Sequence, residues 1–156
     1  MKKLILLLLF VSFSSRADIQ LFGLPTQLHE TLLQKEAKNN YINNENINYI
    51  NLASLSVAEI KQSKTLINEN RTLIIDMTEV YSEEERISYS SIISGLGIDA
   101  PVIVVGNLDG EKIINIVNVN ITDVNGNNIK NESEALESLS SSLVHVLKRF
   151  SAGMSL

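Results

Sequence analysis

Residues 101–112 read Pro-Val-Ile-Val-Val-Gly-Asn-Leu-Asp-Gly-Glu-Lys. The run Pro101–Val105 is rich in β-branched side chains, which favour a buried strand. Asp109 and Gly110 are typical of the tight turn of a β-hairpin, and they lead into a second apolar stretch over Lys112–Val119. The stretch therefore predicts an antiparallel hairpin that forms one edge of a sheet.

Upstream of this hairpin, predicted strands alternate with predicted helices. Apolar runs indicate strands over Ile19–Gly23, Ile47–Leu52 and Thr72–Met77. Helical patterns cover Thr26–Lys38, Ser56–Asn68 and Ser82–Ser94, and a last helix follows Asn131 and runs to about Phe150. The order β-α-β-α-β-α-β-β-α predicts an α/β fold with a mixed sheet and helices on its faces.

Local signals mark where these helices begin. Thr26 is a candidate N-cap, and Leu28, Leu32, Leu33 and Ala37 then recur at helical spacing. Ser56 with Glu59 and Ser82 with Glu85 have the spacing of capping boxes, and Asn131 with Glu134 can cap the last helix.

The first 17 residues have the pattern of a secretory signal peptide. Lys2 and Lys3 precede the apolar run Leu4–Val11, and small residues at Ser15 and Ala17 indicate cleavage before Asp18. The run is shorter than the roughly 20 residues that span a bilayer as a helix, so we expect no stable membrane insertion after cleavage. Residues 18–156 are then expected to form a single domain in the periplasm.

Composition narrows the function of that domain. Without the three basic residues of the signal peptide, ten basic side chains remain against 18 acidic ones, a net charge of about −8. This charge argues against a nucleic-acid partner. The chain has no cysteine, which excludes disulfides, thiol chemistry and a lipoprotein anchor.

Two segments are similar to segments of thioredoxins and glutaredoxins. Leu21–Glu30 resembles their strand–turn–helix, in which Pro-Thr precedes Cys-x-x-Cys, and Gln27 and Glu30 occupy the positions of the two cysteines. Gly97–Val105 resembles the segment that carries the family's cis-proline, which makes Pro101 the candidate cis-proline. The Asn-Leu-Asp-Gly hairpin after it also matches.

This resemblance implies a thioredoxin-like three-layer sandwich without catalytic thiols. Thiol–disulfide exchange needs a thiolate, so the implied protein is not an enzyme and needs no cofactor. Cysteine-poor relatives with signal peptides resemble periplasmic components of conjugative transfer systems and integrating conjugative elements. The resemblance thus implies an assembly or scaffold protein whose partner is an envelope protein of a transfer or secretion apparatus.

An alternative is an exported module that binds calcium or a small ligand. Asp123, Asn125, Asn127 and Glu134 stand at positions one, three, five and twelve of a calcium-loop pattern. Position six is Asn128, where such loops have glycine, and an asparagine-rich turn before a capped helix explains the same residues.

A third alternative is an enzyme on an unrelated α/β fold. Asp76 closes the apolar run Leu73–Ile75 near the end of the third predicted strand, where doubly wound folds bind ligands, so a pocket near Asp76 or Glu30 would be its site. A strand-end aspartate explains the same residue. The two histidines, His29 and His145, are too few for a zinc site and lack a nucleophile partner, which favours packing or surface roles.

Overall fold

The computed structural model describes residues 18–39, 46–68, 71–108, 110–119 and 131–153. The strands are β1 (Asp18–Phe22), β2 (Asn46–Asn51), β3 (Thr72–Asp76), β4 (Val102–Leu108) and β5 (Glu111–Val117). The α-helices are α1 (Gln27–Asn39), α2 (Val57–Ser63), α3 (Glu83–Ser94) and α4 (Glu132–Gly153). Short 3-10 helices follow β2 at Leu52–Ser54 (η1) and α2 at Lys64–Asn68 (η2).

The five strands lie side by side in their chain order. β1, β2 and β3 are parallel, whereas β4 is antiparallel to both β3 and β5. Leu108 pairs with Glu111, so β4 and β5 form the expected hairpin, although Asp109 lies outside the described residues. The α/β class and the mixed sheet are therefore confirmed.

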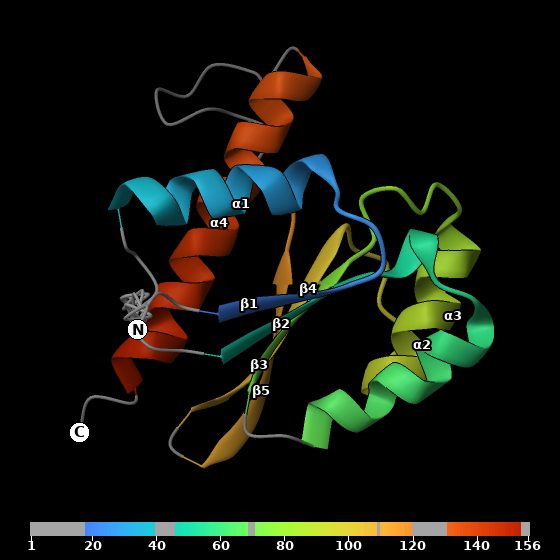
Figure 1. Cartoon of the computed structure of the whole chain (residues 1–156). Helices are drawn as coiled ribbons and strands as arrows, with labels where there is room; N and C mark the ends of the chain where they lie inside the picture. Colours follow the sequence, from blue (N-terminus) through green and yellow to red (C-terminus); the bar gives the residue numbers. More distant parts are fainter. Residues whose placement is uncertain (1–17, 40–45, 69–70, 109, 120–130, 154–156) are drawn as a thin grey trace, which may run out of the picture.

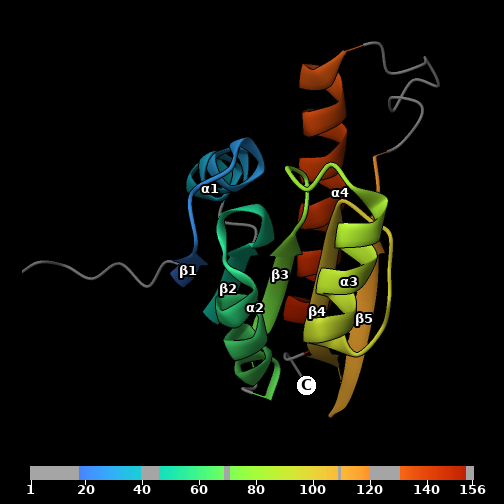
Figure 2. The same cartoon turned by 90° about the vertical axis from the view of Figure 1, so that its right-hand side faces the viewer.

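Helices cover both faces of the sheet (Figure 1; Figure 2). On one face, α1 and α4 bury an apolar cluster against the sheet, and on the other α2 and α3 bury a second cluster. All five residues of β3 are buried, as expected for a central strand covered on both sides.

The two parallel crossovers differ in hand. Both connections, β1 to β2 and β2 to β3, step in the same direction across the sheet, yet α1 covers one face and α2 the other. One of the two is therefore left-handed, whereas about 98% of such connections are right-handed.

The predicted caps form where the described residues include them. The hydroxyl of Thr26 accepts a hydrogen bond from the backbone N–H of His29 at 3.1 Å, and Ser56 and Glu59 make a complete capping box. Ser82 accepts from the backbone N–H of Glu85, while Asn131 and Glu134 bond each other twice.

Two of the four residues predicted to form the apolar face of α1 are buried, and the other two are exposed. Leu28 and Leu32 are buried, but Leu33 is 41% exposed and Ala37 is also exposed. Leu33 lies about 100° further around the helix than Leu32, which turns its side chain away from the sheet.

Gly106 allows α4 to lie close to β4. A Cβ atom at this position would lie 2.8 Å from the ring of Phe150, which is buried near the end of α4. Glycine is the residue that permits such an approach of a side chain to the backbone.

The predicted signal peptide, residues 1–17, lies outside the described residues. Among the residues that are described, no helix combines the length and the apolar character needed to cross a membrane.

Candidate functional site

One edge of the sheet gathers the ends of all five strands. The register aligns Asn51 of β2, Asp76 of β3, Val102 of β4 and Val117 of β5 in one row, and β1 ends beside Ile50. The loops that leave this row are residues 23–26, 52–56 and 77–82, together with residues 99–101 and 118–119. We call this region the carboxyl-end edge, because the three parallel strands end there.

Asp76 is the polar centre beneath this edge, and it is fully buried. Its Oδ2 atom accepts hydrogen bonds from the hydroxyls of Tyr49 at 2.5 Å and Thr26 at 2.6 Å. Its Oδ1 atom accepts from the backbone N–H of Thr78 at 2.8 Å and from the Thr78 hydroxyl at 2.6 Å. The four bonds satisfy a carboxylate that would otherwise be costly to bury.

This network connects three segments that are distant in sequence. Asp76 ends β3, Tyr49 lies in β2, and Thr26 caps α1. Burial, and then the negative charge of Asp76, raise the pKa of Tyr49 far above its ordinary value, so the phenol stays a donor. Asp76 therefore holds the end of the sheet to the start of α1 and has no surface open to a ligand.

His29 packs against the same network from the first turn of α1. Its ring meets that of Tyr49 edge to face, with centroids 4.8 Å apart. Both ring nitrogens are buried and have no hydrogen-bond partner. Burial lowers the pKa of His29, while Glu30 and Asp76 oppose the shift, so the ring packs as a neutral group.

The β1–α1 loop is fixed to the end of β2. The side-chain N–H of Asn51 donates to the carbonyl of Leu24 at 3.0 Å, and Ser54 accepts from the Leu24 N–H at 2.9 Å. Gly23 has a φ of 93°, and a Cβ there would lie 2.3 Å from the Ser54 hydroxyl. This anchoring holds the Leu24 side chain in solvent, 67% exposed.

A pocket of about 360 Å³ opens at the carboxyl-end edge, between the β3–α3 loop and the start of β4. Met77, Val80, Ala100 and Pro101 give it apolar walls. Thr78 and Asn118 add polar groups, and Tyr81, Arg86 and Asp99 also line it.

The pocket is built on two fixed contacts. The backbone N–H of Met77 donates to the carbonyl of Pro101 at 2.8 Å. Arg86 of α3 donates through Nε to Asp99 Oδ1 at 2.6 Å and through a terminal nitrogen to the Val80 carbonyl at 2.8 Å. These bonds join the β3–α3 loop, α3 and the segment before β4 into one frame.

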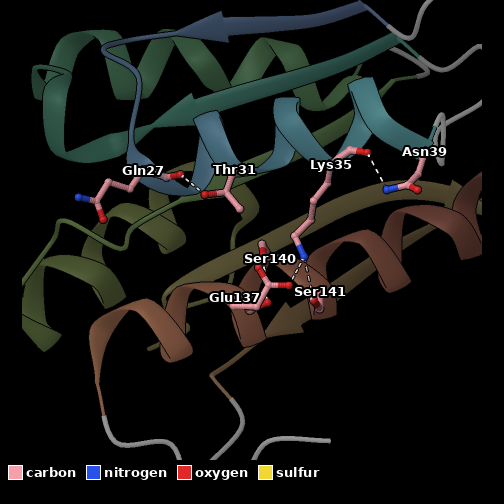
Figure 3. A network of polar contacts seen from close by, with 7 residues as sticks. All are labelled: Gln27, Thr31, Lys35, Asn39, Glu137, Ser140 and Ser141. Atoms are coloured by element: carbon pink, nitrogen blue, oxygen red, sulfur yellow. Dashed lines mark hydrogen bonds and ion pairs between the residues drawn. The ribbon is translucent and has the colours of Figure 1, made fainter.

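The two segments that resemble thioredoxins meet at the end of β3. Thr26, in the first segment, donates a hydrogen bond to Asp76 at the end of β3. Pro101, in the second segment, accepts one from the backbone N–H of Met77, the next residue along the chain. Gln27 and Glu30 are exposed on the first turn of α1. Figure 3 shows Gln27 at the start of α1, where its backbone carbonyl accepts a hydrogen bond from the Thr31 hydroxyl.

The prediction of a cis peptide bond before Pro101 is wrong. The described residues contain no cis peptide bond, so the bond between Ala100 and Pro101 is trans. Trans is the lower-energy form of such a bond by about 0.5–1 kcal/mol, and here it places the Pro101 carbonyl within reach of Met77.

Of the four predicted calcium ligands, Glu134 alone lies among the described residues. Asp123, Asn125 and Asn127 lie outside the described residues. Glu134 is used in the cap of α4, where its side chain accepts from Asn131 at 3.1 Å. In the part of the chain that the structure describes, no three histidine or acidic side chains are grouped to hold a metal ion.

A polar network joins α1 to α4 across the space between them (Figure 3). Lys35 donates to Glu137 at 2.5 Å and to the Ser141 hydroxyl at 3.1 Å. The Glu137 side chain is 65% exposed, so water screens this ion pair and its role is to align the two helices. His145, the second histidine, is exposed further along α4.

The sequence analysis did not identify the residues that line and frame the pocket. Tyr81 is 89% exposed and lines the pocket, while Arg86 and Asp99 form the frame. The sequence signal for Tyr81 was a large aromatic residue in a polar stretch, directly before the helix cap Ser82 and the glutamates at 83–85.

Comparison with known proteins adds one relative. No family model matches the chain, and no solved structure matches it significantly. A curated protein of Vibrio vulnificus (strain CMCP6), called cytolysin secretion protein, is 32% identical over 139 residues. The alignment covers 86% of this chain and 83% of that protein.

Proposed function

The chain belongs to the family of the Vibrio vulnificus cytolysin secretion protein, and from this membership we propose that it acts in the secretion of another protein. The alignment carries the proposal, because it spans most of both chains. A shared role is therefore proposed for the domain as a whole, and not for a short motif within it.

Within secretion, we propose that the chain acts by binding and not by catalysis. The acid at the strand end, Asp76, is buried and uses both carboxylate oxygens in the network that holds α1. The open features of the carboxyl-end edge are the pocket and the exposed side chains of Leu24 and Tyr81. An exposed aromatic side chain that lines a pocket, as Tyr81 does, suits a protein partner.

The proposed partner is an envelope protein of the secretion apparatus, with the periplasm as the place of contact. The pattern of residues 1–17 supports export, because it has the charged start, apolar run and small residues of a signal peptide. The resemblance to thioredoxins favours a conjugative apparatus, but it depends on short motifs. The cytolysin secretion protein aligns over far more of the chain, so we propose a protein-secretion apparatus.

The test is an in-frame deletion of the coding sequence in the native host. Mass spectrometry would compare the proteins of the culture supernatant and of the periplasm in the parent, the deletion strain and the strain with the gene restored. We expect one or a few exported proteins to disappear from the supernatant and to return with the gene. Identical supernatants in all three strains would refute the proposal.

Crosslinking in the native host then identifies the partner. The full chain carrying a C-terminal tag would be crosslinked in intact cells and captured for mass spectrometry. Capture of an apparatus component that the deletion strain still contains supports the envelope partner. Capture of only the protein that fails to be secreted would show instead that the chain binds the secreted protein itself.

A further inference from the structure

The pocket at the carboxyl-end edge has the size and walls for one or two side chains. Its volume of about 360 Å³ is near the lower end for ligand sites, and its walls are mixed, with apolar groups at Val80, Ala100 and Pro101 beside the polar ones. The side-chain amide of Asn118 can bond to a peptide backbone, whereas the Thr78 hydroxyl donates to Asp76 and can only accept. An extended protein segment with apolar side chains is therefore a suitable occupant.

Tyr81 stands at this pocket with 89% of its surface in solvent. Its neighbour Val80 is buried, so the loop backbone is held in place while the tyrosine ring is left outside the core. A tyrosine has two side-chain torsions and a large surface, and such residues are enriched where proteins bind one another.

The surroundings of the pocket are strongly acidic. Residues 77–86, 99–101 and 118 include five acidic side chains and one basic side chain. The basic side chain, Arg86, is bonded to Asp99 and to the Val80 carbonyl. Glu79, Glu83, Glu84 and Glu85 are exposed on the same loop and the first turn of α3.

The excess of acidic side chains favours a partner segment that carries a positive charge. A cationic side chain arriving at the pocket meets a negative potential, whereas an acidic one is repelled. Asp99 bonds Arg86 through Oδ1, and its side chain is 42% exposed, so an incoming arginine or lysine can approach it.

We propose that this pocket docks an extended segment of the secretion partner in which a basic side chain lies between apolar ones. The apolar side chains enter the pocket and pack on Tyr81, and the basic side chain lies among Asp99 and the glutamates of the β3–α3 loop. The identity of the partner rests on the proposed function, but the chemistry of the pocket does not.

Peptide titration tests the pocket directly. The probe is the amidated, acetylated pentapeptide serine-leucine-arginine-leucine-serine, added to the isotope-labelled protein purified from cells that express the full chain. We expect shifts in the backbone NMR signals of residues 77–82, 99–101 and 118, and a weaker affinity as salt is raised. A peptide with glutamate in place of arginine, or with serine in place of both leucines, should leave these signals unmoved.

Variants distinguish binding at the pocket from non-specific binding elsewhere on the surface. Tyr81→Ala should weaken binding about tenfold, and Asp99→Asn should weaken it and reduce its dependence on salt. Leu33→Ala removes an exposed apolar side chain on α1 and should bind as the parent does. Equal affinity in all variants, or shifts confined to other regions, would overturn the proposal. Circular dichroism on each variant would verify that it is folded.

A secretion assay distinguishes this inference from the proposed function. The deletion strain would be supplied with the parent chain, Tyr81→Ala or Leu33→Ala. Loss of secretion with Tyr81→Ala alone supports docking at the pocket. Full secretion with Tyr81→Ala, when deletion abolishes it, refutes the pocket and leaves the proposed function standing. If deletion has no effect on secretion, the proposed function fails, and the peptide titration still decides whether the pocket binds basic, apolar segments.

Discussion

The phenolic oxygen of Tyr49 lies 2.5 Å from Oδ2 of Asp76, and neither residue is exposed to solvent. A hydrogen bond to a buried charge is worth about 1.5–3 kcal/mol, so Tyr49→Phe should lower the free energy of unfolding by about 2 kcal/mol. Urea unfolding followed by circular dichroism measures this change. Tyr81→Phe is the matched control, because that exposed ring is outside the network, and an equal loss in both variants would contradict the prediction.

Removal of the Asp76 carboxylate should lower the free energy of unfolding considerably more than Tyr49→Phe does. Asp76→Ala removes the acceptor of Tyr49, Thr26 and Thr78. The hydroxyls of Tyr49 and Thr26 lie 3.1 Å apart, so one can donate to the other, but the other proton loses its buried partner, at about 1–3 kcal/mol for each unpaired group. We expect a loss of at least about 3 kcal/mol, or failure to fold. Asp99→Ala, in a half-exposed ion pair, should cost under about 1 kcal/mol. A well-folded, fully stable Asp76→Ala variant would show that the network does not hold α1 to the sheet.

Stability should fall as the pH is lowered through the range in which histidine titrates. Burial lowers the pKa of His29 in the folded protein below its ordinary value of 6.5, although Glu30 and Asp76 oppose the shift. The unfolded chain therefore takes up a proton first, and the free energy of unfolding decreases as the pH falls below about 6.5. Thermal melts between about pH 8 and pH 5 measure this slope.

The two histidines provide the control for this pH dependence. His29→Phe keeps an aromatic ring beside Tyr49 and should flatten the slope. His145→Gln alters only an exposed side chain and should leave it unchanged. A slope that survives in His29→Phe would assign it to the carboxylates.

The contact between Gly106 and Phe150 predicts a sensitive position. Gly106→Ala would place a methyl group 2.8 Å from a buried ring, and overpacking of this kind costs about 1–3 kcal/mol. The control is Gly110→Asn, because that glycine has open space around it and asparagine tolerates its positive φ of 82°. Equal melting temperatures for Gly106→Ala and the parent would contradict the close packing of α4 on β4.

Asn48 offers a gain in stability. Its side-chain amide is buried, and neither its nitrogen nor its oxygen has a hydrogen-bond partner. Asn48→Leu should therefore raise the free energy of unfolding by about 1–2 kcal/mol, because an unpaired amide is replaced by an apolar group.

Asn51 is the matched control for this substitution. It is equally buried, but its amide bonds both Leu24 and Ala53. Asn51→Leu should therefore destabilise the protein, and urea unfolding of both variants compares the signs. A loss of stability in Asn48→Leu as large as in Asn51→Leu would contradict the prediction.

Features encoded by neighbouring residues were predictable from the sequence. The hairpin depends on β-branched residues on either side of a short turn, and the caps at Thr26, Ser56 and Asn131 depend on side chains three residues from their partners. These interactions hold wherever the rest of the chain lies. The element order and the α/β class follow from them.

Features that depend on distant residues were not predictable. Asp76 bonds residues 27 and 50 positions away in the sequence, and no local pattern pairs them. The sequence motifs did not predict the pocket for the same reason, because the β3–α3 loop and the segment before β4 form it together. The prediction of a cis-proline was wrong because a short sequence motif does not determine whether the peptide bond is cis or trans. The isomer depends on contacts such as that of Pro101 with Met77.

The strands follow one another across the sheet in the order in which the ribosome makes them. Each new strand therefore finds its neighbour already synthesised, so the sheet can grow from one side without waiting for a later strand to be inserted. The face under α4 is different, because α4 follows all five strands in the chain and packs on β4 and β5 only after both have been made. Until α4 is synthesised, the apolar side chains that β4 and β5 turn toward it have no cover.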